Sequence, residues 1–196
     1  MAWKTLRLRI TGVRPILLHN GQLADPLNQH SKAMKQISGK RNKTDSDHLQ
    51  MAKLEFMGAL YWNKDLGVIL PPEVLEATAI CGAKKLKSGP KAKAGLIFEK
   101  MAKLEYDGPT GLEELWADER FRLTIGVKVG ASRVMRTRPK FDEWSAVIEF
   151  DYDDAIANKT EVVEWFYRAG MEVGMCDWRP KYGRFSVAFA GDDQAA

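Results

Sequence analysis

Apolar and polar residues alternate along residues 3–12, which read WKTLRLRITG. Leu6, Leu8 and Ile10 fall on one side of an extended chain, because successive side chains of a strand point to opposite faces of a sheet. A period of two over ten residues is typical of a strand with one buried face. The chain is therefore expected to begin with a half-buried strand, and this strand requires at least one other layer to cover its apolar side.

The remaining segments predict a mixture of helices and strands. A helix is expected at 71–85, because Pro71-Pro72-Glu73 combines proline, which suits a first helical turn, with an early acid that suits the helix dipole. Further helices are expected at 43–62 and 160–170, a long loop or mobile insertion at 20–39, and strands at 67–70, 94–98, 121–129, 144–152 and 183–190. This order predicts an α+β fold, a ferredoxin-like or RRM-like βαββαβ core with long insertions.

The chain has 196 residues, a length that suits one domain with a generous core. We expect a single RRM-like domain over 1–196, with an inserted segment at about 20–65 and basic loops at 82–95 and 130–141. No apolar run approaches the roughly 18–20 residues of a membrane span, and the start has no signal-peptide pattern. Cys81 and Cys176 suggest no disulfide framework, so we expect free thiols and a cytoplasmic protein.

Positive charge is clustered along the chain, although the net charge is only +4. Residues 82–95 hold five lysines, 130–141 hold four cations and 32–43 hold five, and none of these segments contains an acid. Residues 142–164, by contrast, hold eight acids and one lysine. Each basic segment alone could be a solvated loop. Several such segments together favour a shared face that binds a polyanion.

The segment GMCDWRPKYGRF, residues 174–185, combines two aromatic rings with cations. Rings stack on bases and cations contact phosphates, which is how many proteins bind single strands. The alternative is that Trp178 and Tyr182 pack under the turn as core residues while the cations are solvated. The three arginines of residues 130–141 are expected to form a phosphate track, because guanidinium groups match phosphate oxygens. The candidate nucleic-acid-binding residues are Lys40, Arg41, Lys43, Lys84, Lys85, Lys87, Lys91, Lys93, Arg133, Arg136, Arg138, Lys140, Trp178, Arg179, Lys181, Tyr182 and Arg184.

Four segments together resemble a known family. They read LRLRITGVRPILLHN, ILPPEVLEATAICGAKK, ASRVMRTRPKF and AGMEVGMCDWRPKYGRFSV. In order and shape they are similar to the landmarks of the repeat-associated RNA-binding (RAMP) superfamily, which supplies backbone subunits to CRISPR effector complexes, and the resemblance covers most of residues 5–190. The superfamily's glycine-rich loop is reduced here to Gly174 and Gly183, so side chains would have to hold the strand.

The resemblance implies a protein that coats single-stranded RNA or DNA as a head-to-tail oligomer, either in a defence complex or as a phage or mobile-element relative. In such an oligomer the insertion at 20–43 and the acidic residues 142–164 would contact neighbouring copies. The sequence does not choose between RNA and DNA. The alternative is a structural or assembly protein that uses the fold for protein contacts only.

An enzyme is a further alternative. Some members of the superfamily are metal-independent RNA endonucleases that use a histidine as acid or base, and His19 is the best candidate here, ahead of His30 and His48. We expect no metal and no cofactor, because Asp25, Asp45 and the other acids form no metal-binding motif and no Walker or dinucleotide glycine pattern occurs.

Overall fold

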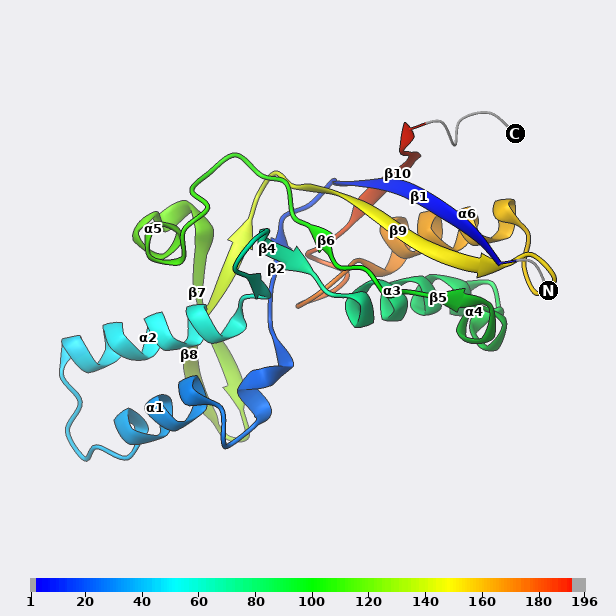
Figure 1. Ribbon diagram of the computed structural model, residues 1–196. Coiled ribbons are helices and arrows are strands. Elements are labelled where there is room, and N and C mark those ends of the chain that lie inside the picture. The colour runs from blue at the N-terminus through cyan, green and yellow to red at the C-terminus, as the bar shows by residue number, and fades with distance from the viewer. Residues whose placement is uncertain (1–2, 192–196) are drawn as a thin grey trace. The chain divides into compact units, whose positions relative to one another are not determined.

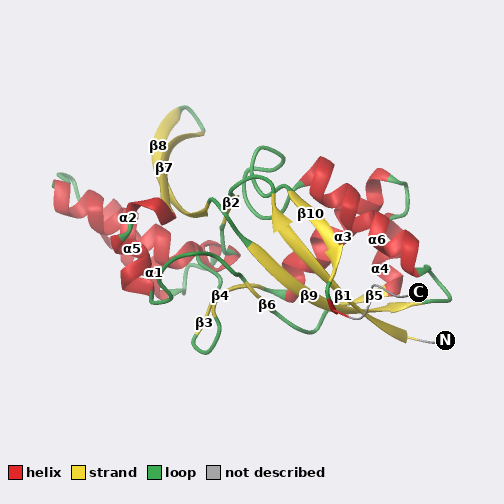
Figure 2. Cartoon of the chain, turned by 90° about the horizontal axis from the view of Figure 1, so that it is seen from above, coloured by secondary structure: helices red, strands yellow, loops and turns green. Residues whose placement is uncertain are grey.

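The computed structural model describes residues 3–191 (Figures 1 and 2). Within these residues the protein is mixed α+β, with three small antiparallel sheets. The chain divides into two compact units, each built from separate stretches of sequence. Unit 1 comprises Met1–Ile16, Trp62–Asp107 and Asp142–Ala196, and unit 2 comprises Leu17–Tyr61 and Gly108–Phe141.

The main sheet of unit 1 has the strand order β10-β1-β9-β5, and every neighbouring pair is antiparallel. The strands are β1 (Trp3–Gly12), β5 (Leu96–Ile97), β9 (Ser145–Asp153) and β10 (Phe185–Phe189). Leu6, Leu8 and Ile10 of β1 are buried and the residues between them are exposed, so the predicted half-buried strand is confirmed.

Two helices cover one face of this sheet in Figures 1 and 2. They are α3 (Pro72–Lys85), on the connection from β1 to β5, and α6 (Lys159–Arg168), on the connection from β9 to β10. The rings of Phe150 and Phe166 lie 5.1 Å apart between sheet and helix, and Phe98 stacks on Phe150 at 4.8 Å. A Cβ atom at Gly82 of α3 would lie 1.9 Å from the carbonyl oxygen of Trp165 in α6, so the helices touch through backbone.

Unit 1 also contains smaller elements. The strands β3 (Trp62–Asn63), β4 (Gly67–Leu70) and β6 (Ala102–Lys103) form the sheet β3-β4-β6. The other elements are the helix α4 (Gly89–Gly95) and the π-helix η3 (Ala169–Val173). The expectation of a basic loop at 82–95 is wrong, because this segment is the end of α3, a short turn and α4. Lys87 adopts a positive φ of 58° in the turn, and Pro90 falls in the first turn of α4, where proline is tolerated.

Unit 2 contains helices and one long hairpin. Its elements are η1 (Gly21–Ala24), α1 (Gln29–Ser38), α2 (Asp45–Ala59), α5 (Leu112–Ala117), η2 (Glu119–Phe121), β7 (Arg122–Val129) and β8 (Ser132–Phe141). The sheet order is β2-β8-β7. The strand β2 (Ile16–Leu17) contains the point in the sequence at which unit 1 ends and unit 2 begins. Its core includes two ring contacts, Phe56 with Trp116 at 5.5 Å and Phe121 with Phe141 at 5.6 Å.

Two segments of unit 2 are more regular than the sequence predicts. Residues 20–39, expected as a loop, form η1 and α1, because the side chains of Asn20 and Asn28 accept backbone N–H groups at the two helix starts. Residues 130–141, expected as a basic loop, are mostly strand β8, which pairs along its length with β7. Gly130 makes the turn between them with a φ of +58°.

Within residues 3–191 no helix is both long and apolar enough to cross a membrane.

Candidate nucleic-acid interface

Residues 174–184 of unit 1, here called the aromatic loop, connect η3 to β10. Gly174 and Gly183 both have positive φ, 79° and 72°, and a Cβ atom at Gly183 would lie 2.0 Å from the carbonyl oxygen of Met175. The backbone closes the loop, since the N–H of Met175 donates to Gly183 at 2.8 Å, and the N–H of Gly183 donates to Pro15 at 2.7 Å. The two glycines therefore allow the backbone to close this loop.

The two rings of the aromatic loop are half-buried. The centroids of Trp178 and Tyr182 lie 6.1 Å apart with planes inclined by 50°, and the N–H of Tyr182 donates to the carbonyl of Trp178 at 3.2 Å. The ammonium of Lys181 lies 5.5 Å from the centre of the Tyr182 ring. Each ring is thus partly covered and keeps part of its surface accessible.

A groove of about 550 Å³ runs beside the aromatic loop, lined by Arg14, Pro15, Pro180, Lys181, Tyr182 and Arg184. Sequence reasoning missed Arg14, which lies two residues after the end of β1. It reaches the loop because the N–H groups of Val13 and Arg14 both donate to the carbonyl of Arg184, at 2.8 and 3.2 Å. Within residues 3–191, the charged groups of Arg14, Lys181 and Arg184 pair with no carboxylate. The groove therefore combines a ring with three cations that lack a counter-charge.

The hairpin β7–β8 divides the arginines of the expected phosphate track between its two faces. Because strand side chains alternate, Arg133 points to the opposite face of β8 from Arg136 and Arg138. Arg133 lies directly opposite Lys128 near the hairpin tip, and the described residues offer neither of them a carboxylate. Like charges in direct cross-strand contact repel, so an anion would relieve this pair. Arg138 and Lys140 are half-buried.

Arg136 has a structural partner. Its Nη1 donates to Oε1 of Glu55 in α2 at 2.6 Å, and the N–H of Thr137 donates to Oε2 at 2.8 Å. The side chain of Glu55 is only 5% exposed, whereas that of Arg136 is 38% exposed. Arg136 therefore neutralises a buried carboxylate, and this contact joins α2 to β8.

The lysines of 84–93 are divided between two helices and a turn. Lys84, Lys87 and Lys93 are exposed, while Lys91 pairs with Glu161 at 2.6 Å and Lys85 lies 4.0 Å from Glu172. The structure therefore leaves part of this cluster available for an anion and uses the rest within unit 1. Arg179, in the aromatic loop, is exposed.

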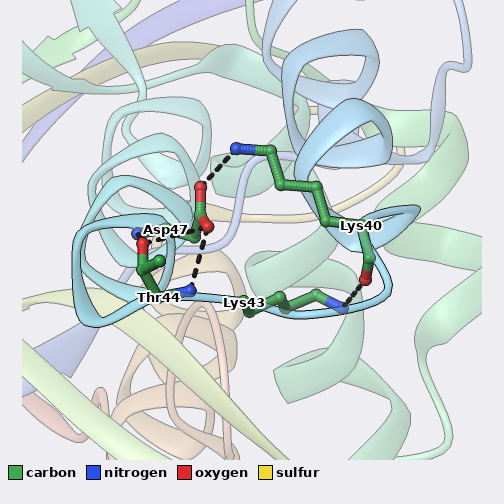
Figure 3. Close-up of polar contacts among 4 residues, drawn as sticks. All are labelled: Lys40, Lys43, Thr44 and Asp47. Carbon is green, nitrogen blue, oxygen red and sulfur yellow. Dashed lines mark hydrogen bonds and ion pairs between the residues drawn. The ribbon is translucent and has the colours of Figure 1, made fainter.

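The cations of residues 40–43 lie at the start of α2 (Figure 3). Lys40 pairs with Asp47, and the ammonium of Lys43 donates to the carbonyl of Lys40 at 3.0 Å. Asp47 also accepts the N–H and hydroxyl of Thr44, each at 3.0 Å, which completes a capping box. Lys40 and Lys43 therefore stabilise this turn, while Arg41 is exposed.

The carboxyl of Asp47 makes this turn sensitive to acid. Its hydrogen bonds from Lys40 and from the N–H of Thr44 lower its pKa from 3.8 to about 2. A depressed pKa in the folded state stabilises the fold above the unfolded pKa, and that contribution is lost as the pH falls through the folded pKa. Comparison of wild type with Asp47→Asn by thermal unfolding should show a lower midpoint for the variant at pH 6. The difference should shrink between pH 4 and pH 2, and a difference independent of pH would contradict this role.

The acids of 142–164 are largely neutralised within unit 1. Asp154 pairs with Lys4 at 2.7 Å, Glu149 with Lys100 at 2.5 Å, and Glu164 with Arg168 at 2.7 Å. The face of the main sheet away from α3 and α6 carries mostly polar and small side chains, together with one tryptophan, along its long strands: Trp3, Thr5, Arg7, Arg9, Thr11, Ser145, Val147, Glu149, Asp151, Ser186 and Ala188. Trp3 is an exposed ring on this face, at the end of β1 where it pairs with Asp153 of β9.

The histidines and Cys81 lie outside the aromatic loop in the chain, whereas Cys176 lies within it. His19 is exposed in unit 2, and its carbonyl accepts the hydroxyl of Tyr61 at 3.1 Å. Burial lowers the pKa of His30 and raises the pKa of the Cys176 thiol to about 12. Within residues 3–191, no group of three or more His, Cys, Asp or Glu side chains could hold a metal ion.

Comparison with known proteins adds no relative: no protein-family model matches the chain, and no curated protein is similar to it in sequence.

Proposed function

We propose that the protein binds single-stranded nucleic acid, RNA or DNA, through the groove beside the aromatic loop. The observation that carries the proposal is the combination of the Tyr182 ring with Arg14, Lys181 and Arg184, whose charges have no carboxylate partner among the described residues. A strand supplies both complementary groups, because each base has a face for stacking and each linkage carries a negative phosphate.

The proposal extends to the fold of unit 1, which we infer to be a ferredoxin-like core. Numbered in chain order, its strands β1, β5, β9 and β10 lie in the order four-one-three-two, with helices after the first and the third. That antiparallel order with two crossing helices supports a βαββαβ arrangement. In this reading unit 2 is inserted into the core as two segments, 17–61 and 108–141.

The protein is further proposed to coat its strand as a head-to-tail oligomer, similar to the backbone subunits of the RAMP superfamily. Each unit has cations without a carboxylate partner: Arg14 and Lys181 in unit 1, and Lys128 and Arg133 in unit 2. Repeated contacts of this kind suit a long polyanion. Many of the acidic residues in 142–164 are paired within unit 1. Fewer of them are therefore left to contact a neighbouring copy in the oligomer.

The test is binding of a fluorescent single-stranded oligonucleotide, measured by anisotropy at low and at moderate salt. Tyr182→Ala should weaken binding about tenfold, because stacking of a base on a ring contributes roughly 1–3 kcal/mol. Arg14→Gln should weaken binding and reduce its dependence on salt, because a phosphate contact releases counterions. RNA and DNA oligonucleotides of one sequence are compared in parallel.

Tyr167→Ala is the matched control, since Tyr167 is 47% exposed on α6 and lies outside the aromatic loop. It should bind like the wild type. Absence of wild-type binding at low salt, or equal binding by both tyrosine variants, would favour the alternative of an assembly protein that makes protein contacts only.

A further inference from the structure

Unit 2 contains a cavity of about 560 Å³, and none of its lining residues lines the groove of unit 1. Segments from both parts of unit 2 line it, from the first helices and from β8. Its volume lies within the range of about 300–1,000 Å³ that is typical of sites for small organic ligands. It is therefore large enough for a ligand of the size of one nucleotide.

The cavity has an apolar part formed by Leu23, Met34 and Met51. All three side chains are half-buried, so each keeps surface that no other part of unit 2 covers. Methionine is polarisable and adapts its shape, and its sulfur makes favourable contacts with aromatic rings. This part suits a flat, mostly apolar ring such as a nucleobase.

Three cations, Lys35, Arg136 and Arg138, line the same cavity with a single carboxylate, that of Glu55. That carboxylate is already satisfied, because Glu55 accepts from Arg136 and from the N–H of Thr137. The contact at Nη1 fixes the guanidinium of Arg136, whose fork has five N–H donors in all. Lys35 is exposed and its ammonium has no carboxylate partner among the described residues. The ammonium of Lys35 beside an apolar surface suits an anion joined to a ring.

We propose that this cavity binds a nucleoside monophosphate group, with the base against Leu23, Met34 and Met51 and the phosphate held by Lys35, Arg136 and Arg138. Planar guanidinium groups match phosphate oxygens in pairs, and an ammonium adds a compact charge. The group belongs either to a free nucleotide or to the phosphorylated end of a strand. This site is additional to the groove of unit 1. A nucleotide can bind here whether or not that groove binds a strand.

The full chain is titrated with adenosine 5′-monophosphate by calorimetry, and with adenosine and inorganic phosphate as separate probes. The monophosphate should bind saturably and more tightly than either part. Lys35→Glu should weaken it by about tenfold or more, because a hydrogen bond to a charged group has that weight. Lys32→Glu is the matched control, since Lys32 is an exposed lysine of the same helix that does not line the cavity, and it should bind within about twofold of wild type.

A second pair of probes distinguishes the source of the ligand. Oligonucleotides of one sequence with a 5′-phosphate or a 5′-hydroxyl are compared in the background of Tyr182→Ala, which weakens binding at the groove of unit 1 equally for both oligonucleotides. Preference for the 5′-phosphate, lost in Lys35→Glu, assigns the site to a strand end, whereas binding of the free monophosphate alone assigns it to a nucleotide. The proposal is overturned if neither probe binds, if inorganic phosphate binds as tightly as the monophosphate, or if both lysine variants bind equally.

Discussion

Gly82→Ala is expected to lower the free energy of unfolding by about 2–3 kcal/mol. The added Cβ would lie 1.9 Å from the carbonyl oxygen of Trp165 and 2.8 Å from the backbone nitrogen of Ala169. Backbone atoms cannot rotate away as a flexible side chain can, so α3 and α6 would have to separate. The better helix propensity of alanine offsets only about 1 kcal/mol of this cost.

Chemical denaturation followed by circular dichroism measures this change. Gly21→Ala is the control, because the structure has nothing within 4 Å of a Cβ atom at Gly21 and its φ is not positive. That variant should unfold within about 0.5 kcal/mol of wild type, as expected for a surface change. Equal stability of Gly82→Ala and wild type would show that α3 and α6 are not in backbone contact.

Glu55→Ala is expected to destabilise unit 2 by about 3 kcal/mol, at the low end of the cost of removing one partner from a buried ion pair. The change leaves the N–H of Thr137 without its acceptor and the guanidinium of Arg136 without its counter-charge. Because Arg136 is partly exposed, water compensates some of its loss. The contact between α2 and β8 should therefore loosen.

Hydrogen exchange at β8 together with denaturant unfolding measures this effect. Lys53→Ala is the matched control on the same helix, because Lys53 pairs at 2.5 Å with Glu113, whose side chain is 73% exposed. Loss of such a surface pair costs about 0–1 kcal/mol. A similar decrease in the free energy of unfolding in both variants would mean that the burial of Glu55 does not make its ion pair more important for stability than a surface pair.

Local patterns in the sequence predict several elements of the structure. The alternation over residues 3–12 identifies β1, and the Pro-Pro-Glu start places α3 at Pro72–Lys85, as expected. The helix expected at 160–170 is α6, in which Val162, Trp165 and Phe166 are buried and Tyr167 is exposed. Which side chains of the helix are buried depends on their position in the helical repeat and not only on whether they are apolar.

Features that depend on distant segments could not be predicted. Arg14 reaches the aromatic loop only because Arg184 accepts two N–H groups from the end of β1. Glu55 meets Arg136 across 81 positions of sequence, which no local pattern records. Polar segments such as 20–39 look like loops until side-chain caps and tertiary contacts allow short helices to form. Which of the candidate residues lie side by side could therefore not be predicted from local sequence patterns.

The position of β1 between β9 and β10 has a consequence for the order of folding. Both partners of the first strand lie beyond residue 144, so β1 emerges from the ribosome long before anything it can pair with. Contacts between such distant positions close large loops and slow the folding of a domain. Until Phe189 has been synthesised, one side of β1 has open hydrogen-bonding groups, and chaperones that hold extended chains would have their best opportunity to bind there.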